Sequence, residues 1–221
     1  MALQIGIIPV TGLQQNCTLV WDDETLEAAF VDPGGNVPRL TAALEKTGAK
    51  LTAIYLTHGH ADHAGGATEL AELTGAPIIG PHKGDEFLLH TMEESAALYR
   101  MKARNCTPSR YLTDGETVQM GSASFTVRHC PGHTPGHVIF YNAEAKLAIV
   151  GDVLFQGSIG RTDFPRGDYQ TLIRSITGKL WPLGDDVAFV PGHGPMSTFG
   201  QERRTNPFVA DEILAEAAAD S

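Results

Sequence analysis

The feature that most constrains this chain is the run His58-Gly-His60-Ala-Asp62-His63, which directly follows the apolar segment 51–57. That segment is too short for a helix and has glycines on both sides, so we expect a short buried strand. Neutral imidazoles and carboxylates are ligands that zinc, iron and manganese accept. His58 and His60, two apart in extended chain, can point toward one ion. Asp62 and His63 fall at the turn into the next helix and can face a neighbouring ion.

Three further apolar segments end in the same way, with a turn that contains glycine and then a metal-binding residue type. His133 follows 123–132, Asp152 follows 146–151, and His193 follows 187–192. Loops at strand ends hold ligands rigidly, and glycine lets the backbone approach closely. A carboxylate has two oxygens, so Asp152 can bridge two ions. We therefore expect a metal centre built from strand ends.

Composition excludes several classes of protein. The 221 residues have 42% hydrophobic and 19% charged residues, which is typical of a globular chain. A net charge of −10 argues against a nucleic-acid partner. We expect no membrane span, because no apolar run approaches about 20 residues. The start has no secretory pattern and the three cysteines cannot all pair, which favours the cytoplasm.

The chain reads as one domain, 1–221, of the α+β class, because strand and helix patterns alternate without a linker. The first half predicts strands at 3–10, 17–22, 27–34, 51–57 and 76–80, with helices at 36–48 and 63–75 and a mixed segment at 84–104. The second half predicts strands within 116–120, 123–132, 137–152 (turning at 142–146) and 186–194, and a helix over 168–183. A short C-terminal helix is expected at about 207–219. This order indicates two packed sheets with helices outside.

The motifs "THGHADH", "PGHTPGH", "GD" at 151–152 and "PGHG" at 191–194 resemble those of the metallo-β-lactamase superfamily, in the family's order. The resemblance covers residues 5 to about 205. It implies an αββα sandwich with two divalent metal ions at one edge of the two sheets. Zinc is the first expectation for these ions, with iron or manganese as alternatives. The implied ligand sets are His58, His60 and His133 for one ion, and Asp62, His63 and His193 for the other, bridged by Asp152.

Within the superfamily, "CPGHTPGHVIFY" and "GDVLFQGSIGRTDFPRGD" are similar to the short bacterial hydroxyacylglutathione hydrolases, the glyoxalase II family. The resemblance implies hydrolysis of S-lactoylglutathione or a related thioester. Metal coordination lowers the pKa of bound water to about 7, and the resulting hydroxide attacks the carbonyl carbon. The thiolate that leaves has a pKa near 8.5, so it needs no strong general acid. Asp62 and Asp152 are the expected catalytic carboxylates, and Asp62 also helps to orient the nucleophile.

Recognition of the substrate is less fully specified by the motifs. Arg161 stands where the family has a substrate-binding Lys, and Arg166 is a second candidate. Asp163 stands where the family has a substrate-contacting Tyr, which is a departure from the pattern. Only 28 residues follow His193, so we expect most of the glutathione-contacting helical domain of larger glyoxalases to be missing. A surface or structural ion pair is the alternative for both arginines.

Other readings of the same motifs stay open. "GRTDF" at 160–164 is also similar to persulfide dioxygenases, where only the equivalents of His58, His133 and Asp152 bind a single iron. Hydrolysis of a lactone or a phosphodiester is another possibility, and a non-catalytic metal-binding module is a third. His82, His90 and His129 are expected to be ordinary structural or surface residues, and His137 to orient the turn that carries His133. We expect a monomer or a small homo-oligomer acting on a small molecule.

Overall fold

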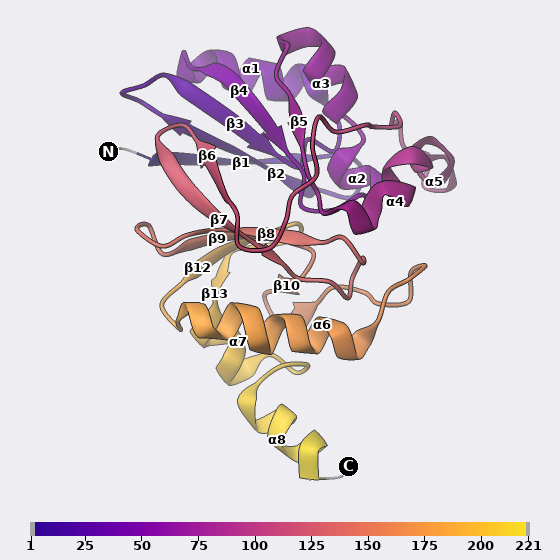
Figure 1. Ribbon diagram of the computed structural model, residues 1–221, viewed down its shortest axis with the longest axis vertical. Coiled ribbons are helices and arrows are strands. Elements are labelled where there is room, and N and C mark those ends of the chain that lie inside the picture. Colours follow the sequence, from indigo (N-terminus) through magenta and orange to yellow (C-terminus); the bar gives the residue numbers. More distant parts are fainter. Residues whose placement is uncertain (1–2, 220–221) are drawn as a thin grey trace.

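The computed structural model describes residues 3–219, and in it two β-sheets pack face to face (Figure 1). One sheet has the strand order β1-β2-β3-β4-β5, formed by Leu3–Val10, Gln15–Asp22, Glu27–Val31, Lys50–Tyr55 and Ile78–Ile79. The other has the order β13-β12-β9-β8-β7-β6, formed by Ser197–Thr198, Ala188–Pro191, Leu147–Gly151, Val138–Asn142, Ala123–His129 and Thr117–Met120. A separate hairpin pairs β10 (Leu154–Phe155) with β11 (Ser158–Ile159).

Helices cover the outer faces of both sheets (Figure 1). The first sheet is covered by α1 (Val37–Thr47) and α3 (Ala67–Thr74), and the second by α6 (Tyr169–Ser175) and α7 (Phe199–Thr205). A π-turn, η2 (Ile176–Leu180), and a 3-10 turn, η3 (Trp181–Leu183), continue α6. Short helices gather at one end of the sandwich: α2 (Ala61–Ala64), η1 (Lys83–Asp85), α4 (Glu86–His90) and α5 (Met92–Leu98). The last helix is α8 (Asp211–Ala219).

Three apolar layers hold this arrangement together. Residues such as Val31, Tyr55, Phe125 and Phe140 form the layer between the two sheets. A second cluster packs α1 and α3 on the first sheet, and a third packs α6 and α7 on the second sheet. Apolar residues alternate with polar ones along outer strands such as β6, which gives each strand an inward face. The predicted αββα sandwich is therefore confirmed.

Two predicted helices differ from the structure. The helix expected over 63–75 is two helices, α2 and α3, because Gly65 and Gly66 break it. A side chain at Gly66 would lie 2.6 Å from the carbonyl oxygen of Pro33, so this turn passes very close to the loop after β3. The helices 36–48 and 168–183 are confirmed; Asp168 caps the second by accepting from the amide of Thr171, 2.7 Å away.

The C-terminal helix predicted at about 207–219 begins at Asp211 instead. Asn206 ends α7 in an extended conformation, which a residue before proline prefers. Its side-chain oxygen accepts from the amide of Phe208 at 3.0 Å, so Pro207–Ala210 forms a turn between two helices. The end of the expected segment, Asp220 and Ser221, lies outside the described residues.

Parallel strand pairs decide where the functional loops meet. β3 pairs with β4 in parallel, and β9 pairs with β12 in parallel, so within each pair the carboxyl ends reach the same edge. The residues just beyond these ends include Asp32, His58, Asp152 and His193. Asn16, at the start of β2, joins the two sheets there: its amide donates to the Gly192 carbonyl at 2.7 Å. The candidate residues therefore gather at one edge of the sandwich.

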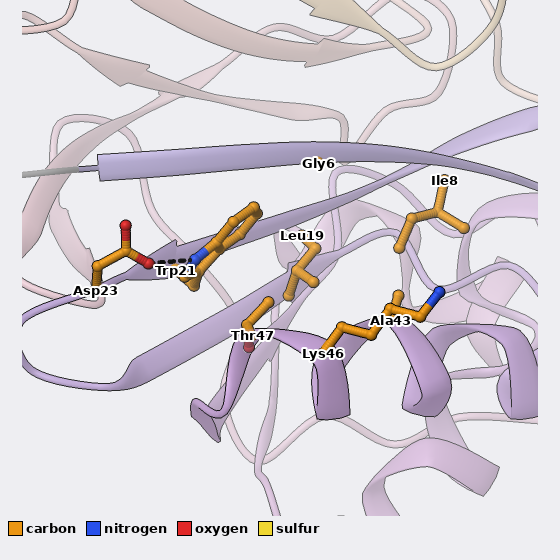
Figure 2. Close-up of a pocket in the computed structure, with 8 residues that line it drawn as sticks. All are labelled: Gly6, Ile8, Leu19, Trp21, Asp23, Ala43, Lys46 and Thr47. Carbon is orange, nitrogen blue, oxygen red and sulfur yellow. Dashed lines mark hydrogen bonds between the residues drawn. The ribbon is translucent and has the colours of Figure 1, made fainter.

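A shallow groove lies between the outer face of the first sheet and α1 (Figure 2). Ile8, Leu19 and Trp21 line its apolar side, and the indole nitrogen of Trp21 donates to Asp23 at 2.8 Å. None of the residues that line it is a candidate site residue. Between residues 3 and 219, no helix combines the length and apolarity that a membrane crossing requires.

Candidate metal centre

The first group of candidate ligands contains His58 and His60, from the loop after β4, and His133, from the loop after β7. The Nε2 atom of His58 lies 3.1 Å from Nδ1 of His60, which in turn lies 3.0 Å from Nε2 of His133. Nitrogens bound at about 2.0–2.1 Å to a tetrahedral ion lie about 3.3 Å apart. Three imidazole nitrogens so close together therefore fit one ion.

The second group contains Asp62, His63 and His193. The Nε2 atom of His193 lies 3.2 Å from Oδ2 of Asp62, and Nε2 of His63 lies 3.8 Å from the same oxygen. Asp62 and His63 come from the first turn of α2, whereas His193 follows β12. The structure brings these three predicted residues together, and they could hold a second ion.

Asp152 lies between the two groups. Its Oδ1 is 3.2 Å from Nε2 of His63, and its Oδ2 is 3.6 Å from Nε2 of His133 and 3.7 Å from Nε2 of His193. The buried atoms Asp152 Oδ1 and His63 Nε2 have no hydrogen-bond partner. Unpaired buried polar atoms are costly, and a cation between the groups would satisfy both. The residues present therefore fit a dinuclear site.

A carboxylate that sequence reasoning did not select, Asp32, orients two of the histidines. Its Oδ2 accepts from Nδ1 of His63 at 2.8 Å and from the hydroxyl of Thr57 at 2.6 Å. That hydroxyl oxygen lies 3.0 Å from Nδ1 of His58 and accepts its proton. In their neutral forms, both rings then carry hydrogen on Nδ1 and turn a bare Nε2 inward, which is the tautomer that a metal ion requires.

Backbone groups orient the remaining side chains. His133 donates from Nδ1 to the Arg161 carbonyl at 2.7 Å, and His193 donates from Nδ1 to the Leu13 carbonyl at 3.2 Å. The buried Nε2 of His137 accepts from the amide of Asp152 at 3.0 Å. His137 was expected to orient the His133 turn; its carbonyl accepts from Cys130 to close that turn, while its ring positions Asp152.

Burial and charge together set the protonation of the two groups. Burial and the neighbouring histidines hold the pKa of His58 well below its usual range and lower that of His60 to about 3. Burial also opposes a charge on His63, but Asp152 and Asp62 outweigh it and raise its pKa well above normal. The first group is therefore neutral and ready to coordinate, whereas His63 must release a proton before it can bind a metal ion.

Glycine is required at the tight turn after β12. A side chain at Gly192 would lie 2.0 Å from Oδ1 of Asp152 and 2.6 Å from Cε1 of His63. No side chain fits in that space, so the backbone of Gly192 forms part of the wall around the cluster. The sequence prediction that glycines allow close backbone approach at these strand ends is confirmed at this position.

The two candidate substrate-binding arginines lie on the loop after β11. The Arg161 guanidinium lies 4.5 Å from the ring centre of Phe164 and pairs with Asp163 at 2.7 Å. The Phe164 ring is in turn 4.9 Å from that of His60. Arg166 lies 4.0 Å from the ring centre of Phe87 in α4. The ring of Phe164 therefore contacts both Arg161 and His60 of the cluster.

The histidines expected to be ordinary lie outside the cluster. His82 and His129 stack on each other with ring centres 4.1 Å apart, and His90 is exposed at the end of α4. Within residues 3–219, the groups of side chains close enough together to hold an ion contain only Asp32 and six of the seven predicted ligands. The seventh, Asp152, belongs to none of these groups. The three cysteines are buried and unpaired.

The sequence contained a signal for Asp32, which went unrecognised. It directly follows the apolar strand 27–31, and Pro33 and two glycines come after it, so strand, metal-binding residue type and turn occur together here as at Asp152 and His193, but with the turn last. The strand predicted over 27–34 includes Asp32, whereas in the structure the strand ends at Val31. Only the parallel pairing of β3 with β4 brings Asp32 beside Thr57 and the histidines.

Comparison with known proteins agrees with this geometry. The family model described as the metallo-beta-lactamase superfamily matches residues 10–193. The chain belongs to this superfamily. It is 48% identical over 209 residues to the hydroxyacylglutathione hydrolase GloC of Haemophilus influenzae, covering 94% of this chain and 98% of that protein. The predicted family is therefore confirmed, and the chain is an enzyme of the metallohydrolase kind.

Solved structures of the superfamily superpose along nearly the whole chain. The BLEG-1 B3 metallo-beta-lactamase has a TM-score of 0.86 at 34% identity and covers 93% of this chain and 99% of its own. TTHA1623 in a di-iron-bound form has a TM-score of 0.84 at 36% identity, with 92% and 100% covered. ETHE1 from Myxococcus xanthus has a TM-score of 0.79 at 26% identity, with 97% and 89% covered.

Proposed function

We propose that this protein hydrolyses S-lactoylglutathione, or a related hydroxyacylglutathione, to glutathione and the free acid. The proposal places two divalent ions, zinc in the first instance, on the seven ligands His58, His60, Asp62, His63, His133, Asp152 and His193. The observation that carries it is the position of Asp152, within 3.2–3.7 Å of imidazole nitrogens from both groups. A carboxylate shared in this way suits a binuclear hydrolytic centre.

The choice of a thioester rests on similarity and on chemistry. The relative from Haemophilus influenzae that shares 48% of its residues carries the name hydroxyacylglutathione hydrolase. A thiolate leaving group with a pKa near 8.5 departs without strong protonation, so a site built from ligands and carboxylates is sufficient for it. The location in the cytoplasm and the single domain over 1–221 remain predictions.

Different residues of the chain orient the attacking water and bind the substrate in this reaction. When bound, the two ions supply Lewis acidity, which makes a water acidic and polarises a carbonyl. Asp62, whose side chain is 15% exposed, accepts a hydrogen bond from the attacking water and orients it. Arg161 stands 65% exposed beyond Phe164, where its guanidinium meets a carboxylate of the glutathione part. Arg166, stacked on Phe87, is the second cation available to that part.

The alternative is dioxygenation of a persulfide at one iron, held by His58, His133 and Asp152 alone. The second group favours the binuclear hydrolase, since Oδ2 of Asp62 lies 3.2 Å from Nε2 of His193 and 3.8 Å from Nε2 of the buried His63. In the iron reading, the unpaired Nε2 of His63 would have no ligand role. Hydrolysis of a lactone, a β-lactam or a phosphodiester would use the same binuclear centre and differs only in substrate.

One experiment separates these functions. The purified protein is analysed for metals and assayed for glutathione release from S-lactoylglutathione without oxygen. We expect about two ions per chain and full anaerobic turnover, with most of the activity lost in His63→Ala. One iron per chain, oxygen uptake with glutathione persulfide and no anaerobic thioesterase activity would establish the dioxygenase instead. Parallel assays with a lactone, a β-lactam and a phosphodiester identify the other hydrolases.

A further inference from the structure

A buried carboxylate outside the ligand set connects the two loops that carry the first group. Asp85 ends η1 and is fully buried. Its Oδ2 accepts from the amide of Gly59 at 2.9 Å and from the hydroxyl of Thr134 at 2.7 Å. Its Oδ1 accepts from the amide of Gly136 at 2.5 Å. Gly59 separates His58 from His60, and Thr134 follows His133 directly.

The packing around Asp85 leaves little freedom to either loop. A side chain at Gly59 would lie 2.8 Å from Cβ of Leu88, and one at Gly136 would lie 2.4 Å from the amide nitrogen of Asp85. The amide of His82 also donates to the Gly136 carbonyl at 3.1 Å. The segment 82–88 is therefore wedged between the two loops, and the carboxylate is the group that bonds to both.

We propose that Asp85 is a positioning residue, which holds the His58–His60 loop against the His133 loop and so assembles the three-imidazole group for one ion. Asp85 bonds to neither histidine of the second group, since His63 is oriented by Asp32 and His193 by the Leu13 carbonyl. This inference rests on the proposed ligand assignment. It does not depend on which substrate the enzyme takes.

The chemistry explains why an ionised side chain is kept at so costly a position. Burial of a carboxylate is unfavourable, and here it raises the pKa of Asp85 to about 6. In return, a carboxylate offers acceptors on both oxygens, and three donors from two loops use them. Asparagine has nearly the same shape but one oxygen. In either orientation its amino group would face a backbone N–H, at Gly59 or at Gly136, so one loop would be released.

The test is a titration of the metal-free protein with Zn²⁺, with Co²⁺ absorption as a second readout. In a His193→Ala background, which leaves the first group intact, Asp85→Asn should weaken the remaining ion about 10–100-fold, as loss of an orienting partner does. In a His60→Ala background, Asp85→Asn should leave the affinity of the remaining ion unchanged. Equal weakening in both backgrounds, or in neither, would overturn the proposal.

Asp22→Asn is the matched control for loss of stability. Asp22 is a buried carboxylate that accepts from the amides of Glu24 and Thr25, at the end of β2 away from the cluster. This variant should bind both ions as the wild type does, even where its Tm falls.

Thr134→Val serves if Asp85→Asn does not fold. It keeps the carboxylate and removes one bond, so it should weaken the same ion by a smaller factor; unchanged affinity would count against the proposal. If the unmodified protein failed to hydrolyse thioesters, the proposed function would fall while these affinities still decided the role of Asp85.

Discussion

Asp152 is the side chain that lies between the two candidate ligand groups. It is 12% exposed at the side chain, and its oxygens face His63, His133 and His193. Each other ligand belongs to one group only. His137 holds the Asp152 amide, and Gly192 leaves the space that its Oδ1 occupies. The consequences of a change at this residue therefore differ from those at any other ligand.

Asp152→Ala should reduce the occupancy of both ions, whereas His193→Ala should mainly reduce one. The reason is that Asp152 contributes an oxygen to each group, while His193 reaches the second group only. Elemental analysis of the two purified variants beside the wild type measures this. Full, unchanged metal content in Asp152→Ala would remove it from the ligand set.

Arg161→Ala should raise KM for S-lactoylglutathione by about fivefold at most with little change in kcat, because an exposed charge pair screened by water contributes only weakly to binding. The backbone carbonyl that holds His133 stays in place in this variant. Arg174→Ala is the control, since this exposed arginine of α6 lies beside Asp168 at 4.0 Å. An unchanged KM, or kcat and stability lost together, would show that Arg161 is structural.

Asp85 should make the stability of the metal-free protein depend on pH. Its pKa is raised from 3.8 to about 6 by burial, so the folded protein binds this proton more tightly than the unfolded chain. The contribution of this proton to the free energy of unfolding is therefore largest below about pH 4, and it is lost as the pH rises through about 6. The unfolding free energy of the wild type relative to Asp85→Asn should fall by about 2 kcal/mol between about pH 4.5 and about pH 7.

Urea titrations of the two metal-free proteins at these pH values give this difference directly. Subtracting the variant cancels the histidines, which titrate in both proteins. A difference that did not change with pH would mean that Asp85 keeps an ordinary pKa in the folded state.

At the scale of elements, the turns after the strands carry the centre, and close approach of backbone makes them specific. The carboxyl ends of β3 and β4 supply Asp32 and His58, and those of β9 and β12 supply Asp152 and His193. β7 adds His133 after a longer turn. Short, tightly packed turns give these side chains fixed directions, and a methyl group is enough to disturb them.

Gly192→Ala should lower metal content and activity without preventing folding, because the added methyl would overlap Oδ1 of Asp152 at 2.0 Å. A steric conflict of this size is relieved only by moving Asp152 or the turn. Gly12→Ala is the control, since an added methyl there meets nothing within 4 Å. Metal content equal to that of the control would show that the turn after β12 adapts freely.

At the scale of the whole molecule, the candidate metal centre lies where loops from both sheets meet, at one edge of the apolar layer that packs the sheets together. One ligand group draws on the loop after β4 and the loop after β7, which belong to different sheets. The other draws on α2 and the turn after β12. An ion bound there would connect both halves of the sandwich, and it would stabilise the folded state because the unfolded chain has no such site.

Removal of the metals by a chelator should lower the Tm markedly. At a metal concentration about 100 times Kd, each ion adds about 2.7 kcal/mol. For a chain of this size that corresponds to roughly 5–10 °C for each ion. Scanning calorimetry before and after chelation, with re-addition of Zn²⁺, measures the shift. Asp152→Ala should show a much smaller shift, and a wild-type Tm unaffected by chelation would mean that the ions do not link the sheets.

The sequence by itself determined the residue types of the site, the strand-end positions of its ligands and the class of fold. Histidine and aspartate after short apolar runs are local patterns, and so are the caps at Gly48 and Asp168, which lie at the ends of their helices as predicted. Local patterns depend on neighbours in the chain, and these are read directly from the sequence.

Only the tertiary structure decided how closely the candidate ligands approach one another, and which residues support them. Asp32 accepts from His63, 31 residues away, through the pairing of β3 with β4. Asp85 accepts from the amide of Gly59, 26 residues away, because segment 82–88 packs between the two histidine loops. The break at Gly65 and Gly66 and the late start of α8 also arise from contacts with distant backbone or from a capping side chain. Such contacts join residues far apart in the chain, so they exist only once the sheets have packed.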